Sequence, residues 1–144
     1  MRQQFWTIFG QYMTPLLSAD GEKINWVNYK TGEKGIHFRM EANNKKASIA
    51  IELTQPDAGI RELYFEQFVQ LRNILEDSLN EEWVWLSQTT DFNGKPISRI
   101  YTELQGVSIF KKEDWPAIIS FLKPRIMGLD EFWSTVKYGF EALR

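Results

Sequence analysis

The chain contains no cysteine among its 144 residues. Disulfide bonds, thiolate ligands for zinc and a cysteine nucleophile are therefore excluded. There is also only one histidine, His37, so an imidazole metal site or a Ser-His-Asp triad would depend on that single side chain. The sequence accordingly predicts neither a metal nor a cofactor, and it offers no residue to assign as catalytic.

Phosphate-binding loops and membrane segments are missing as well. No GxxxxGK[ST] loop occurs, and no GxGxxG follows a predicted strand, which removes the usual nucleotide-phosphate sites. No apolar run approaches the roughly 20 residues that span a bilayer. The first residues lack the apolar core and cleavage site of a signal peptide. We therefore expect a soluble cytoplasmic protein that has no membrane contact.

Aromatic residues, in contrast, are abundant, with six Trp, five Tyr and ten Phe. Aromatic side chains bury large apolar areas, so the composition predicts a large core in a single globular domain over residues 1–144. A chain of this length buries roughly two-thirds of its unfolded surface. The formal net charge of −2 argues against a strong, non-specific nucleic-acid binder but leaves room for a local basic patch.

The stretch from Gly35 to Leu53 reads as a β-hairpin that turns at Asn43-Asn44. Because side chains alternate along a strand, one face of this hairpin is apolar. The pairs expected on that face are Met40 with Ala47, Phe38 with Ile49, and Ile36 with Ile51. The opposite, polar face is expected to carry His37, Arg39 and Glu41 opposite Ala50, Ser48 and Lys46.

Further strands are predicted on either side of this hairpin. Ile24–Lys30 alternates so that Trp26 lies next to Arg39. A second hairpin joins Trp83–Thr90 to Ile97–Leu104 through Asn93-Gly94, the strongest short hairpin signal. The pairs expected on its core face are Trp85 with Thr102 and Trp83 with Leu104, and Val107–Phe110 is a candidate for one more short strand.

Three stretches show apolar residues at helical spacing. The first covers residues 3–17 and is ended by Pro15. The second follows Asp57, a suitable N-cap, and we expect its exposed face to hold Arg61, Glu62, Arg72 and Glu76. The third continues to Phe140, and Pro124 should kink or divide it. The whole pattern predicts an α+β fold, an antiparallel twisted sheet of about five or six strands with helices packed mainly on one face.

The polar outer face of this sheet is the candidate binding surface. Arg39 and Arg99 are each expected beside an aromatic ring, an arrangement that can stack nucleic-acid bases or hold an anion. The predicted ligand-binding residues are Trp26, Asn28, His37, Arg39, Arg99 and Tyr101. A non-catalytic module would use them to recognise a nucleic acid or a protein. The plainer alternative is that they only hold the outer face of the sheet together.

Two other functions stay open at this point. Glu41, Glu52 and His37 could serve a small metal-dependent nuclease or hydrolase. Against this, the Asp/Glu-x-Lys pattern of a restriction-endonuclease core is missing, because Leu53 and Thr54 follow Glu52. Alternatively, the chain could be a structural homodimer whose sheet faces pair and bury Trp26 and Tyr101.

Several stretches carry a resemblance to a known family: FWTIFGQYM, GEKINWVNYKTGEKGIHFRMEANNKKASIAIE, DAGIRELYFEQF, SRIY and FWSTVKYGF. Together they resemble the bacterial family called domain of unknown function 4268, over essentially the whole chain. The resemblance implies no established activity and no catalytic residues. In longer relatives a similar domain follows an endonuclease-like domain, which implies an accessory role in nucleic-acid processing or defence.

Overall fold

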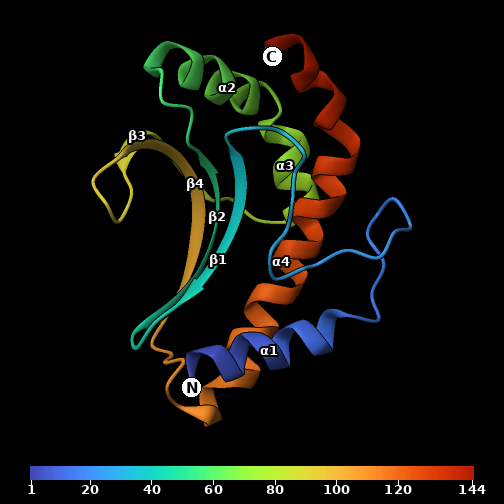
Figure 1. Ribbon diagram of the computed structural model, residues 1–144, viewed down its shortest axis with the longest axis vertical. Coiled ribbons are helices and arrows are strands. Elements are labelled where there is room, and N and C mark those ends of the chain that lie inside the picture. The colour runs from blue at the N-terminus through green and yellow to red at the C-terminus, as the bar shows by residue number, and fades with distance from the viewer.

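The computed structural model describes all 144 residues (Figure 1). Its sheet is antiparallel, with four strands in the order β1-β2-β4-β3. The strands are β1 (Ile36–Ala42), β2 (Lys46–Leu53), β3 (Val84–Thr90) and β4 (Pro96–Gln105). The helices are α1 (Arg2–Met13), α2 (Ala58–Gln70), α3 (Arg72–Leu79) and α4 (Trp115–Val136), with short 3₁₀ helices at Lys112–Asp114 and Lys137–Leu143. The predicted α+β class is confirmed.

The central hairpin has the predicted faces but a different register. Phe38 pairs with Ile51, two residues beyond the expected Ile49. The cause is the turn, which is centred at Asn44-Lys45, one residue later than predicted: the N–H of Asn43 donates to the carbonyl of Lys46, and the Asn43 side chain accepts the backbone N–H groups of Lys45 and Lys46. A shift of two residues leaves each side chain on its own face, and the apolar face is buried as predicted.

The second hairpin shows the same kind of shift. Trp85 pairs with Ile100 rather than with Thr102, and an irregularity separates Leu86 from Thr89. The extra residue of such a bulge bends the strand and increases its local twist. The tryptophan face is again the core face, since Trp83 belongs to the core and Trp85 packs against it.

The expected fifth and sixth strands are absent, so the prediction of five or six strands was wrong. Ile24–Lys30 is irregular. The backbone N–H of Asn28 donates to the Asn25 side chain, so it does not donate to a neighbouring strand. Val107–Phe110 is held in a similar way, with the N–H of Ser108 donating to Asp114. Alternating apolar residues in both segments reflect contacts with the core and not sheet pairing.

The helices lie on one side of the sheet, and Figure 1 shows the β3–β4 hairpin bent away on the other side. Asp57 caps α2 as predicted, accepting the N–H of Ile60. The stretch then breaks at Leu71 into α2 and α3, and Arg61, expected on the exposed face, is buried and donates to the carbonyl of Gln55. Pro124 lies inside α4, which continues through it as one helix.

One core of 29 buried residues joins the inner face of the sheet to all four helices. The long helix α4 contacts β1 and β2, and α1 packs against α4. No helix of the structure is both long and apolar enough to cross a membrane. Since all four helices pack on the inner face of the sheet, the outer face carries no helix.

Candidate binding surface

The outer face of the sheet is ordered in rows that cross the strands. The paired register places His37, Glu52, Arg99 and Leu86 in one row and Arg39, Ala50, Tyr101 and Val84 in the next. Charged side chains therefore gather on β1, β2 and the Arg99 position of β4, whereas the two β3 residues of these rows, Leu86 and Val84, are apolar. We call this surface, with the β3–β4 hairpin beside it, the outer face.

Glu52 lies at the centre of the outer face, between two arginines. Its carboxylate binds Nε of Arg39 at 2.8 Å and lies 3.6 Å from Nε of Arg99. The Arg99 guanidinium also stacks over the ring of Tyr101, 4.1 Å from the ring centroid. Burial raises the pKa of the Glu52 carboxyl, and the two arginines offset part of that increase. The two arginines that were expected to bind an anion thus share one carboxylate, which offsets one of their two positive charges.

His37 lies at the β1 end of the same row, opposite Glu52. Its Nε2 is 3.1 Å from the hydroxyl oxygen of Thr54. Burial lowers the pKa of His37, and the positive charge of Arg39 lowers it further. A neutral imidazole beside a hydroxyl fits a structural hydrogen bond, and no acidic residue is hydrogen-bonded to the ring to make it a general base.

The tip of the β3–β4 hairpin places a phenylalanine in solvent. Asp91 closes the turn, because its Oδ1 accepts the N–H groups of Asn93 and Lys95 at 2.8 and 2.9 Å. Two backbone hydrogen bonds between Asp91 and Lys95 or Gly94 complete it, and Gly94 has the positive φ of 80° that favours glycine. Phe92 stands on this turn with its side chain fully exposed.

Two shallow hollows adjoin on the outer face. The first has a volume of about 410 Å³ and lies between the hairpin tip and the charged row. Its lining residues include Arg39, Glu41, Glu52, Asp91, Phe92 and Arg99. The second, of about 610 Å³, shares Glu41, Phe92 and Arg99 and continues to Trp6 of α1. An extended chain could therefore cross the outer face under Phe92.

The structure brings together four of the six predicted site residues: His37, Arg39, Arg99 and Tyr101. Trp26 is not among them, since it is 3% exposed within the core and its indole donates to the carbonyl of Leu16. The prediction failed for Trp26 because residues 24–30 do not form a strand. The same burial removes the proposed homodimer face that would cover Trp26.

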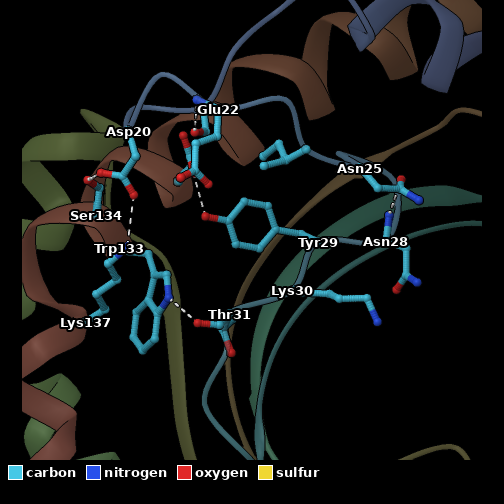
Figure 2. A pocket seen from close by; sticks show the side chains of 13 residues that line it. Asp20, Glu22, Asn25, Asn28, Tyr29, Lys30, Thr31, Trp133, Ser134 and Lys137 are labelled. Atoms are coloured by element: carbon cyan, nitrogen blue, oxygen red, sulfur yellow. Dashed lines mark hydrogen bonds and ion pairs between the residues drawn. The ribbon is translucent and has the colours of Figure 1, made fainter.

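Asn28 lies in a different hollow, between the 18–31 segment and α4 (Figure 2). This hollow measures about 310 Å³. Figure 2 shows the Tyr29 ring inside it, with its hydroxyl donating to Asp130 Oδ1 at 2.6 Å, and the N–H of Ala19 binds the other oxygen of that carboxylate. Burial and the bond to Asp130 raise the pKa of Tyr29 strongly.

The Asp20 carboxylate is a second polar group of the hollow whose hydrogen-bond partners belong to the chain itself. Asp20 accepts the hydroxyl of Ser134 at 2.5 Å and Nζ of Lys137 at 2.9 Å, and the indole of Trp133 donates to the carbonyl of Thr31. The Ser134 and Lys137 bonds lower the pKa of Asp20. Since these groups bind one another, we interpret the hollow as the attachment of the 18–31 segment to α4.

The carboxylates considered for metal chemistry do not form a site. Glu52 is paired with two arginines, and no group of three or more His, Asp or Glu side chains is arranged so that it could hold a metal ion. A catalytic divalent metal held by carboxylates needs oxygen ligands that are free and convergent. The residues therefore do not fit the metal-dependent nuclease or hydrolase alternative.

Sequence reasoning missed Phe92 and Asp91 as parts of the surface, because Phe92 was considered only as part of the turn Phe92-Asn93-Gly94-Lys95 and Asp91 was not considered. A signal was present in the sequence: Phe92 stands directly before Asn93-Gly94. Turn positions are dominated by Gly, Pro, Asn, Asp and Ser, and a large aromatic side chain there has no core to enter. An aromatic residue in a tight turn is therefore expected to be exposed.

Comparison with known families gives one result. Residues 1–137 match the model of a family described as Domain of unknown function (DUF4268). No curated protein and no solved structure shows a significant match to the chain.

Proposed function

Because the chain belongs to the DUF4268 family, which is defined as a domain of unknown function, we propose from its geometry alone that it is a non-catalytic binding module. Its ligand is a protein segment that lies across the outer face, under the β3–β4 hairpin. An accessory role in nucleic-acid processing or defence would then depend on binding to another protein.

The observation that carries the proposal is Phe92. This ring is fully exposed on a turn that four local hydrogen bonds hold in one conformation. A rigid aromatic side chain loses little conformational entropy on binding, and aromatic residues dominate the energetics of protein interfaces. Elsewhere on the outer face, Val84, Leu86 and Tyr101 add partly exposed apolar area.

The charge of the outer face supports a protein ligand over a nucleic acid. Arg39 and Arg99 both bind Glu52, and Lys46 binds Glu103. Nucleic-acid affinity comes largely from cations that neutralise phosphates. These three cations already face a carboxylate, which Arg39 and Arg99 share, so phosphate would compete with an existing partner.

Selection from a library of short random peptides displayed on phage tests the proposal. Wild-type protein should enrich a family of related peptides, and Phe92→Ala should abolish their binding while leaving the thermal midpoint unchanged. Tyr138→Ala is the matched control, because Tyr138 is another exposed aromatic side chain, on the last 3₁₀ helix. It should bind the selected peptides like the wild type.

Two results would contradict the proposal. The first is a selection that enriches no peptide, or peptides that Phe92→Ala still binds with full affinity. The second is tight, salt-dependent binding of a single-stranded oligonucleotide that Arg39→Ala abolishes, because that would restore the nucleic-acid interpretation.

A further inference from the structure

We propose that the ligand segment inserts a lysine or arginine side chain into the hollow under the β3–β4 hairpin, between Glu41, Asp91 and the ring of Phe92. This inference rests on the function proposed above and makes its partner specific: a polypeptide with a basic residue at one fixed position.

The hollow carries an excess of negative charge. Its lining contains two arginines and three carboxylates. Both arginines are directed at Glu52, at 2.8 and 3.6 Å. Glu41, which is exposed on β1, forms no ion pair and no hydrogen bond in the structure. Its negative charge is therefore available to a cation from outside.

Asp91 supplies a second carboxylate in a fixed position. Its Oδ1 accepts two backbone N–H groups of the turn, which immobilises the side chain, and no cationic side chain lies within ion-pairing distance of it. Because the turn uses only Oδ1, Oδ2 has no partner within the chain. The hairpin thus holds one carboxylate oxygen ready for an incoming donor without any change in its own conformation.

Phe92 lines the same hollow as Glu41 and Asp91. A cation over an aromatic face is attracted by the ring quadrupole, and within this hollow the ring faces no cation of the chain, because the Arg99 guanidinium stacks on Tyr101 instead. Two unpaired carboxylates and a free ring suit an ammonium or guanidinium group on an apolar stem. An anionic side chain would instead meet Glu41 and Asp91 and would have to displace Glu52 from its arginines.

Isosteric variants test this specificity. The double variant Glu41→Gln, Asp91→Asn removes both charges, and asparagine keeps the Oδ1 acceptor that closes the turn. The control variant Glu62→Gln, Glu82→Gln removes two exposed carboxylates that do not line the hollow. The same phage-displayed random peptide library is selected against wild type and both variants, and circular dichroism and thermal midpoints confirm that all three are folded alike.

We expect wild type and control to enrich peptides with lysine or arginine at one shared position, and the Glu41→Gln, Asp91→Asn variant to lose that preference. For a synthetic peptide of the enriched sequence, the Kd should rise about tenfold with the double variant, as the carboxylate contacts of the basic residue are lost. Replacing the basic residue of the peptide by methionine should raise the Kd for wild type at least as much. It should raise the Kd for the double variant clearly less, because only the contact of the cation with the Phe92 ring is left to lose.

The outcomes separate this inference from the function on which it rests. Peptides that require Phe92 but carry no conserved basic residue, or an acidic one, would overturn the basic-residue inference and leave the binding module standing. A selection that yields no peptide dependent on Phe92 would overturn both.

Discussion

Single residues decide what the outer face can bind. Glu52 was considered above as a metal ligand, yet it lies between Arg39 and Arg99 and its negative charge is shared by these two cations of the chain. The distinction depends on register, because Glu52 pairs directly with His37 and Arg99. Sequence alternation could place these residues on one face, but only the observed pairing shows which of them touch.

Phe38 provides the test of which face is buried. Its ring stacks on Tyr29 at 5.2 Å and meets Trp133 edge-on at 5.9 Å. Phe38→Ala should lower the free energy of unfolding by roughly 3–5 kcal/mol through lost burial and a residual cavity. Urea denaturation measures this, with exposed Glu41→Ala on the same strand as the control. An unchanged midpoint for Phe38→Ala would mean that the faces are reversed.

His37 predicts a pH dependence of stability. Its pKa in the folded protein lies below the ordinary 6.5, so the unfolded chain binds the proton more readily. The contribution of neutral His37 is complete above pH 6.5 and is lost as the pH falls from 6.5 toward the lowered value. Arg39 opposes protonation, while Glu52, across the strand pair, is the nearest acidic group.

The measurement is the difference in unfolding free energy between wild type and His37→Gln across this pH range. The carboxylates, including Glu52, titrate in both proteins, so their contribution to the unfolding free energy cancels in this difference. The wild type should lose stability relative to the variant as the pH falls. A difference that does not change with pH would show that His37 titrates alike in the folded and unfolded chains.

Among the elements, the attachment of the 18–31 segment to α4 is where sequence reasoning went furthest astray. The strand predicted for Ile24–Lys30 had the right apolar residues but lacked a partner strand. Instead, the Trp26 indole donates to the carbonyl of Leu16, ten positions earlier, and the Tyr29 hydroxyl donates to Asp130, 101 positions later. The bond to Asp130 joins distant parts of the chain, so no local sequence pattern could predict it.

Tyr29→Phe tests this attachment. The change removes the hydroxyl that donates to the buried Asp130 carboxylate, and an unsatisfied buried acceptor costs roughly 1–3 kcal/mol. We expect that loss in chemical denaturation, together with faster hydrogen exchange in the 18–31 segment. Tyr138→Phe, which removes an exposed hydroxyl without a partner, is the control. Equal behaviour of the two variants would mean that the hydrogen bond to Asp130 contributes nothing.

Helix α2 offers a second test at this scale. The Asp57 carboxylate accepts the N–H of Ile60 at 2.9 Å, so Asp57→Ala should cost about 0.5–2 kcal/mol. Thermal or urea unfolding measures the loss, with Glu62→Ala in the same helix as the control. A stability equal to that of the control would argue against the cap. This element was predictable because its signal is local, whereas the break at Leu71 was not.

For the whole molecule, the sequence was sufficient for the α+β class, for both hairpins and for the side of the sheet that faces the core. It was insufficient for the number of strands, because Ile24–Lys30 and Val107–Phe110 alternate without pairing. Four of six site residues were placed correctly, since alternation along β1 and β4 fixes their face. The hairpin tip was missed because the exposure of Phe92 depends on how the β3–β4 hairpin bends away from the core.

The central claim is that the outer face and hairpin tip bind a protein segment. Its most direct test is a ¹H–¹⁵N NMR titration of the wild-type protein with a synthetic peptide of the sequence enriched in the phage selection. The account predicts amide shifts confined to β1, β2, β4 and residues 91–95. Shifts centred instead on the hollow between the 18–31 segment and α4, around Asn28 and Ser134, would contradict it.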